Sequence, residues 1–343
     1  MPDFLPAKYA FSHDYAVFLN DILSAFVRDG EQVGLFTAQI RLKDRAEATA
    51  FTDAPDDHKW EWLKANGYGD ALSGVIYKHV IVALLSDFCH FVFEALSCSR
   101  KGKLTVAYSL LRKPFKDNLF YLEWLLADPA GFIAAFSHDG PDKLEEFRSK
   151  RHLRFPLIEK AISQTSTRGM FDAAFIDEIR YDRKLEYGFA ASWDQASHLI
   201  TTFPAIRTSP ESFNFVFLNP QDGEQWEFLY SRLPMLLYYA IEVVEALIAR
   251  LLPHPELLAD TTSNRREIGY MLWTASLGGA DLALDSDAIP LPPCPQCGLS
   301  SPMDKANMLS YYNDLKITCR GCGTVNAIPD QANQPRQEGN NRA

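Results

Sequence analysis

Residues 70–97 read DALSGVIYKHVIVALLSDFCHFVFEALS and form the longest apolar segment with a helical pattern in this chain. Apolar side chains recur in it at the spacing of one face of an α-helix. Lys78, Asp87 and Glu94 interrupt the segment, so it lacks the run of about 18 uncharged apolar residues that a membrane-spanning helix needs. We therefore predict a long core helix in a soluble, mainly α-helical protein.

Helical periodicity extends from about residue 13 to about residue 277, which predicts a multi-helix bundle. Pro114 lies inside the helix predicted over residues 103–127 and should kink or split it, because proline lacks the N–H that continues the hydrogen-bond ladder. We expect a further break before Pro156 and a bend at Pro234. The remaining helices are predicted over residues 13–28, 32–50, 142–164, 170–182, 189–202, 225–252 and 264–277.

The composition limits the classes of function. The chain has 343 residues, 47% of them hydrophobic, and a net charge of -10. Residues 294–326 carry +1 and residues 327–343 are neutral, so the body before them carries -11. A body this acidic argues against sequence-independent nucleic-acid binding, which depends on basic side chains that neutralise phosphates.

Four cysteines form two pairs, Cys294-Pro-Gln-Cys297-Gly and Cys319-Arg-Gly-Cys322-Gly. Two C-x-x-C pairs with roughly 20 residues between them suit a tetrahedral site in which each pair supplies two thiolates to one metal ion. The glycine after each pair permits a tight turn. We predict one structural Zn²⁺ per chain, held by all four cysteines, with no open position for a substrate. Iron–sulfur and redox sites are the alternatives, although a redox C-x-x-C would begin a helix in a βαβ context that the pattern does not predict.

The composition changes after residue 278. Residues 279–293 are small, acidic and proline-bearing, as in a linker. The zinc ribbon follows over 294–328, and strand-favouring residues on both sides of its second cysteine pair predict a short β-hairpin. Residues 329–343 are polar and lack large apolar side chains, which predicts a disordered tail. The sequence thus predicts a helical domain over 1–278, a linker, a ribbon and a tail.

Two features favour a cytoplasmic protein without a membrane anchor. The N-terminus lacks the basic start and apolar run of a secretory signal. Cys89 and Cys98 lie in one predicted helix and are separated by about 13 Å along its axis, beyond the roughly 7 Å limit for a disulfide. We therefore interpret both as free thiols.

Two polar stripes run along the central predicted helices. If they face each other, they form a polar groove suited to acid–base chemistry or anion binding. The alternative is that each is the solvated face of an amphipathic helix. The stripes comprise His79, Ser86, His90, Glu94 and Ser97 in one helix, and Arg112, Lys116 and Glu123 in the next.

Two further groups are open to a functional and a structural interpretation. Asp194 and His198 lie four residues apart and can share a helix face, so Asp194 could orient His198 as a base. The alternative is a hydrogen-bonded histidine at the edge of the core. A basic run is either a local nucleic-acid contact or a solvated helix face, and it comprises Arg148, Lys150, Arg151 and Arg154.

Residues 108–118, YSLLRKPFKDN, continue to Asp128 as an aromatic-rich segment, and residues 193–198 read WDQASH. This arrangement resembles an uncharacterised group of bacterial helical proteins related to the HEPN superfamily. In that group an arginine-bearing helix leads into an aromatic-rich one, and a serine–histidine helix follows. The resemblance covers residues 70–250. It implies a helical bundle that dimerises, in a superfamily with many ribonuclease toxins and phage-defence components.

The chain departs from the HEPN nuclease pattern at one point. Those nucleases carry an arginine and a histidine separated by four to six residues, and no such pair occurs in this sequence. Arg148 and His152 are separated by three residues, as are Arg250 and His254. The departure argues against nuclease activity, although the fold implied by the resemblance is unaffected.

These observations lead to one expectation and two alternatives. We expect a non-catalytic binding or assembly protein whose ribbon contacts a protein or nucleic-acid partner, possible settings being bacterial defence or a toxin–antitoxin-like system. The first alternative is a metal-independent ribonuclease with a degenerate pair, in which Arg112 stabilises transition-state charge and His198 moves the proton. The second is a scaffold that homodimerises through an apolar face.

Overall fold

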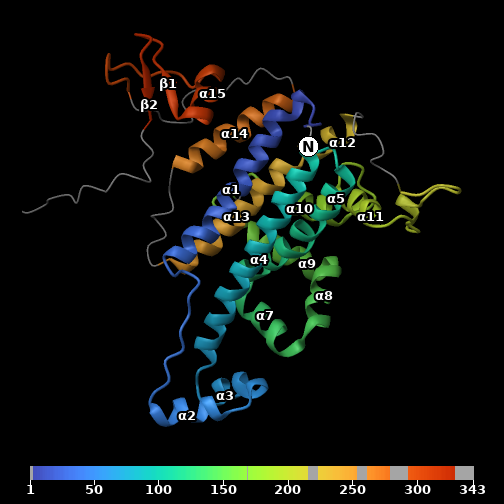
Figure 1. The fold of residues 1–343 in the computed structure, drawn as a ribbon, viewed down its shortest axis with the longest axis vertical. Coiled ribbons are helices and arrows are strands. Elements are labelled where there is room, and N and C mark those ends of the chain that lie inside the picture. Colours follow the sequence, from blue (N-terminus) through green and yellow to red (C-terminus); the bar gives the residue numbers. More distant parts are fainter. Residues whose placement is uncertain (1–2, 168, 215–222, 253–260, 279–292, 329–343) are drawn as a thin grey trace, which may run out of the picture. The chain divides into compact units, whose positions relative to one another are not determined.

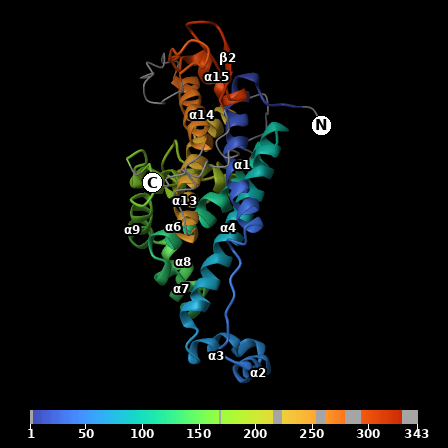
Figure 2. The ribbon, with the colours of Figure 1, turned by 90° about the vertical axis from the view of Figure 1, so that its left-hand side faces the viewer.

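The computed structural model describes residues 3–167, 169–214, 223–252, 261–278 and 293–328. Within these ranges the chain is mainly α-helical, with one two-stranded hairpin, as Figure 1 and Figure 2 show. The predicted fold class is therefore confirmed. The chain divides into two compact units, Met1–Pro253 and His254–Ala343, which are described in turn.

The first unit is built entirely of helical elements among the residues described. Of its short elements, η1, η2 and η5 are 3-10 helices, and η3 and η4 are π-helical turns. In chain order the elements are η1 (Ala7–Tyr9), α1 (Ala10–Gln32), α2 (Arg45–Asp53), η2 (Asp56–His58), α3 (Lys59–Ala65), α4 (Gly69–Arg100), α5 (Leu104–Lys113), η3 (Pro114–Asn118), α6 (Leu119–Ala127), α7 (Pro129–Ala134), η4 (Ala135–Asp139), α8 (Pro141–Ser149), α9 (Arg151–Ile162), α10 (Ala173–Tyr181), α11 (Phe189–Ser197), η5 (Pro204–Ile206), α12 (Gly223–Tyr230) and α13 (Leu233–Leu251).

The core of this unit is centred on α13 and α6. Leu236, Leu237 and Tyr239 of α13 are fully buried, as is Leu125 of α6. α1 lies along both α4 and α13, and α13 contacts α6 (Figure 1). Each large apolar side chain buried in this way contributes about 1.5–3 kcal/mol relative to exposure, so these helices hold the unit together.

The helix predicted over residues 70–97 is confirmed as α4. By length and composition alone α4 could cross a membrane, although the core helix of a soluble protein passes the same test. Leu85, Phe88 and Val92 are buried, and α4 contacts α1, α5, η3 and α6. These contacts fit a core helix.

The break predicted at Pro114 is confirmed as a π-helical turn, η3, between α5 and α6. Such a turn disturbs the regular i to i-4 hydrogen bonds of a helix. Side chains of α10 bind two of its carbonyl groups. The Arg180 guanidinium donates to Phe115 O over 3.2 Å, and the Tyr181 hydroxyl donates to Lys116 O over 2.7 Å. α10 therefore fixes the path of the chain through η3.

Beside this turn lies a buried ion pair. Arg180 Nη2 donates to both carboxylate oxygens of Glu123, over 2.7 and 3.0 Å, and the Tyr239 hydroxyl donates to the same carboxylate over 2.7 Å. Arg180, Glu123 and Tyr239 are all fully buried. The triad ties α6, α10 and α13 together at one point of the core.

The helix predicted over residues 32–50 is wrong. α1 continues to Gln32, and the next helix, α2, begins only at Arg45. Between them Ile40 and Leu42 pack against a small apolar cluster that includes the start of α4. These two apolar residues alternate with polar ones, which is the pattern of an extended segment with one buried face.

Two proline positions also differ from expectation. The predicted helix over residues 225–252 is two helices, because the chain leaves helical geometry at Arg232 and α13 begins with Pro234 in its first turn. A proline is favourable there, since the missing N–H would have no partner. Pro156 lies inside α9, and the break falls instead at Lys150, between α8 and α9.

The second unit contains α14 (Thr261–Gly278), α15 (Lys305–Asp314), β1 (Lys316–Thr318) and β2 (Val325–Ala327). The two strands pair in antiparallel fashion, with Ile317 opposite Asn326, and confirm the predicted hairpin. Apolar side chains that are buried around the hairpin and α15 are Met303, Met308, Tyr311, Tyr312 and Ile317.

The boundary between the units differs from the predicted domain boundary. α14 contacts α15, so the compact units divide at residue 253 and not at residue 278. Apart from Pro293, the linker predicted over 279–293 lies outside the described residues, and so does the tail predicted over 329–343.

Candidate metal centre and cationic pocket

Each cysteine pair of the second unit forms the same tight turn. The N–H of Gly298 donates to Cys294 O over 2.8 Å, and the N–H of Gly323 donates to Cys319 O over 2.8 Å. The φ angles of Gly298 and Gly323 are 72° and 73°. This left-handed region strains any residue that has a Cβ atom, which explains the glycine after each pair.

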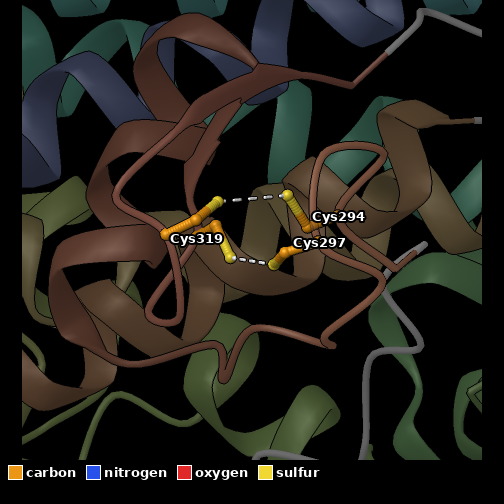
Figure 3. Close-up of side chains that lie close together, drawn as sticks. Cys294, Cys297 and Cys319 are labelled. Carbon is orange, nitrogen blue, oxygen red and sulfur yellow. Dashed lines mark hydrogen bonds between the residues drawn. The ribbon is translucent and has the colours of Figure 1, made fainter.

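The two turns bring four sulfur atoms together. All four Sγ atoms lie within 4.8 Å of one another. Cys294 Sγ lies 3.7 Å from Cys322 Sγ, and Cys297 Sγ lies 3.5 Å from Cys319 Sγ (Figure 3). Four sulfurs at about 2.3 Å from one tetrahedral ion stand about 3.8 Å apart, whereas a disulfide bond is about 2.0 Å long. The spacing fits a four-coordinate metal ion.

The ionisation of these thiols also suits a cation. The backbone N–H of Cys322 is the first cause that lowers the pKa of Cys319, to about 6, which favours the thiolate form that binds metal ions. The backbone N–H of Leu299 lowers the pKa of Cys297, but the neighbouring thiols outweigh it and raise that pKa to about 12. Four thiolates at this spacing repel one another, and a divalent cation at their centre removes the repulsion.

A helix between the two cysteine pairs, α15, was not predicted. The Asp304 side chain caps it by accepting from Asn307 N–H over 2.9 Å. Asn307 is buried, and its side chain accepts from Thr318 N–H and donates to Pro302 O, each over 2.9 Å. These bonds fix α15 to β1 immediately before Cys319. On the other strand, the Asn326 amide lies 3.5 Å from Cys294 Sγ and supports that ligand.

The two polar stripes predicted in the first unit do not form one groove. His79, His90 and Glu94 of α4 are exposed, which favours the solvated-face interpretation of that stripe. In the second stripe Glu123 belongs to the buried ion pair with Arg180. Its other two members, Arg112 and Lys116, line a pocket formed with other helices.

This pocket has a volume of about 410 Å³ and lies wholly within the first unit. Five of its lining residues are cationic and two are acidic, so the wall is strongly positive. α5 and η3 supply one side, α8 and α9 a second, and the end of α10 with the segment after it a third. The lining residues are Arg112, Lys116, Glu145, Arg148, Ser149, Arg154, Tyr181, Asp182, Arg183 and Phe203.

Three of the cations in this wall are already paired with carboxylates. Each pair is close enough for a charge-assisted hydrogen bond. The pairs are Arg148 with Asp117 at 2.6 Å, Arg154 with Asp177 at 2.7 Å, and Arg183 with Asp194 at 2.5 Å. The basic run is therefore tied into the unit by ion pairs and is not a solvated helix face throughout.

The remaining two cations are Lys116 and Arg112. Lys116 is 8% exposed, and its side chain has no hydrogen-bond partner among the residues that the structure describes. Arg112 Nε is buried and likewise makes no hydrogen bond within the described ranges, although Asp194 Oδ1 lies 3.7 Å away. These two side chains come from neighbouring turns, one at the end of α5 and the other in η3.

The proposed partnership of Asp194 and His198 is not seen. One carboxylate oxygen of Asp194 accepts from Arg183, and the other faces Arg112. His198 follows the last residue of α11, is exposed and does not line the pocket. The structure therefore groups Arg112 with Lys116 and Arg183, and places His198 outside that group.

Sequence reasoning missed Arg183 and the burial of Lys116. Lys116 was assigned with Arg112 to one polar stripe for which anion binding was one interpretation, and both residues line the pocket. Arg183 lies in a loop after α10, and no local pattern places it beside α5. A lysine two residues after a helix-breaking proline was the one available signal.

Cys89 and Cys98 are free, as predicted, and Cys89 is buried. Burial is the first cause that raises the pKa of Cys89, to about 11, so this thiol is unreactive at neutral pH.

Comparisons of the chain with protein-family models, curated proteins and solved structures found no match.

Proposed function

We propose that this chain is a non-catalytic binding or assembly protein whose second unit is stabilised by one structural Zn²⁺. The observation that carries the proposal is the closed cluster of four cysteine sulfurs within 4.8 Å of one another. Four protein thiolates fill a tetrahedral shell and leave no position for a substrate or an activated water molecule. Zinc is favoured because it takes this geometry with thiolate ligands and carries out no redox chemistry.

The hairpin and α15 around the metal offer a surface to a partner. Leu299 and Val325 are exposed by 56% and 58%, although each lies close in sequence to a cysteine ligand. Exposed apolar side chains held by a rigid metal turn are suited to contact a protein. A bacterial defence or toxin–antitoxin-like assembly is the setting that the HEPN-like pattern supports.

Metal analysis tests the first part of this proposal. We expect purified protein to contain one Zn²⁺ per chain by elemental mass spectrometry and the Cys319→Ser variant to contain much less. Cys98→Ser is the matched control, because that thiol lies outside the cluster, and its zinc content should equal that of the wild type. Stoichiometric iron in place of zinc would contradict the proposed metal.

Two assays separate the alternatives. We expect no cleavage of RNA by the zinc-loaded protein. Cleavage that is lost in Arg112→Ala or His198→Ala would overturn the non-catalytic proposal in favour of a ribonuclease.

Light scattering before and after zinc removal tests the scaffold alternative. A mass that halves on zinc removal would identify the second unit as a homodimer contact.

A further inference from the structure

The cationic pocket of the first unit has a feature that the metal centre does not explain. Lys116 and Arg112 bring two positive charges to a hollow of about 410 Å³, where Lys116 has no carboxylate partner among the described residues and Arg112 lies 3.7 Å from Asp194. The one nearby carboxylate, Asp194, is already hydrogen-bonded to Arg183. Lys116 has no such partner and Arg112 only shares Asp194 with Arg183, so these two charges are the least compensated part of the pocket.

The charge of Lys116 is costly unless a ligand completes the site, because Lys116 is buried, whereas the Arg112 side chain is 34% exposed. Burying a charged side chain without a partner costs several kcal/mol, and buried charges in proteins are therefore normally paired. The backbone at Lys116 is nevertheless fixed by a contact from another helix. The π-helical turn η3 carries Lys116, and Tyr181 fixes that turn by donating a hydrogen bond to Lys116 O. The backbone of Lys116 is thus fixed in η3, and Lys116 lines the hollow.

We propose that this pocket binds a phosphate-bearing small molecule, with the dianionic phosphate held between Lys116 and Arg112. A phosphate dianion supplies two negative charges and several acceptor oxygens, which matches one ammonium and one guanidinium group. A single carboxylate would leave one of the two cations uncompensated. The volume lies within the range of about 300–1,000 Å³ that is usual for small-molecule sites, so it accommodates more than the phosphate alone.

Calorimetric titration of the full chain tests this proposal. The probes are inorganic phosphate, adenosine 5′-monophosphate, adenosine and acetate, at constant ionic strength. We expect both phosphate probes to bind, and adenosine and acetate not to bind measurably. Tighter binding of the nucleotide than of inorganic phosphate would identify a phosphomonoester as the ligand. Equal affinity would show that the pocket recognises the phosphate group alone.

Matched variants assign the binding to these two residues. Lys116→Met and Arg112→Met should each weaken phosphate binding roughly tenfold or more, the loss of one charge-assisted contact. Lys160→Met is the control, because Lys160 is exposed on α9 and outside the pocket, and its affinity should equal that of the wild type. Lys116→Met removes a buried unpaired charge, so its melting temperature without ligand should be equal to or above that of the wild type.

The pH dependence provides a second readout. Burial is the first cause that lowers the pKa of Lys116, to about 8. Asp194 opposes this shift, while Arg112, Arg183 and Arg148 add to it. Sulfate, which keeps its two charges across this range, should therefore bind more weakly as the pH rises above about 8, because Lys116 loses its proton. Lys116→Met should lack this decline.

Three results would overturn the proposal. They are the absence of binding by every phosphate probe, an unchanged phosphate affinity in both Lys116→Met and Arg112→Met, and acetate binding as tight as phosphate binding. None of these results depends on zinc, so they test the phosphate proposal without testing the zinc proposal for the second unit.

Discussion

At the scale of single residues, the first unit uses charge in two opposite ways. Arg180 and Glu123 are completely buried and satisfy each other, with Tyr239 as a third partner. Lys116 and Arg112 lie a few residues away in the chain and have no equivalent partner in the described structure. The first arrangement holds helices together, and the second leaves binding capacity in a pocket.

The buried pair leads to a prediction about stability. Glu123→Gln keeps the shape of the side chain but leaves the Arg180 guanidinium uncompensated, so the free energy of unfolding of the first unit should fall by about 3–5 kcal/mol. Urea denaturation followed by tryptophan fluorescence measures this change. Glu94→Gln, an exposed carboxylate on α4, should change it by less than about 0.5 kcal/mol. A small effect in Glu123→Gln would show that the pair contributes little net stability.

At the scale of elements, local sequence determined some features and long-range packing determined others. Pro114 predicted a break because a missing N–H acts locally, and the glycines after the cysteine pairs predicted tight turns for the same reason. The π-helical form of the break was not predictable, because it depends on Arg180 and Tyr181 from a distant helix. The cluster of four cysteines was predictable from the sequence because the spacing of the two pairs alone defines it.

The unpredicted helix α15 has a testable role in the metal unit. Asn307→Ala removes the hydrogen bonds to Thr318 and Pro302 and leaves their buried backbone groups without partners, which costs about 1–3 kcal/mol. Because folding and metal binding are linked, the affinity for zinc should fall roughly fivefold to a hundredfold, as a chelator competition assay would show. Asn313→Ala, an exposed position on the same helix, should bind zinc as the wild type does. Equal affinities for the two variants would assign the fixing of β1 to other contacts.

At the scale of the whole molecule, the two units depend on different forces. The first has a large apolar core, whereas the second combines a cluster of four cysteines with a few buried side chains. The sequence predicted a helical part and a separate cysteine-containing part, but placed the boundary between them after α14 instead of before it. Nothing in the pattern of residues 261–278 shows that their partner is a helix between two cysteine pairs.

Chelation of the metal should therefore affect the units unequally. We expect hydrogen exchange of residues 293–328 to accelerate by several orders of magnitude after zinc removal, while α1, α4, α6 and α13 keep their protection. Mass spectrometry of exchanged peptides measures both regions in one sample. Loss of protection in α13 on chelation would show that the first unit also depends on the metal.

The π-helical turn η3 has a further consequence for the relative orientation of α5 and α6. A π-helical turn holds about one residue more than an α-helical turn, because its hydrogen bonds span five residues instead of four. Removing one residue between Pro114 and Asn118 would restore the regular repeat and rotate α5 by about 100° relative to α6. Arg112 on α5 could then not face Asp194 while Glu123 on α6 still binds Arg180. A one-residue deletion in η3 should therefore lower the free energy of unfolding of the first unit, which urea denaturation would measure.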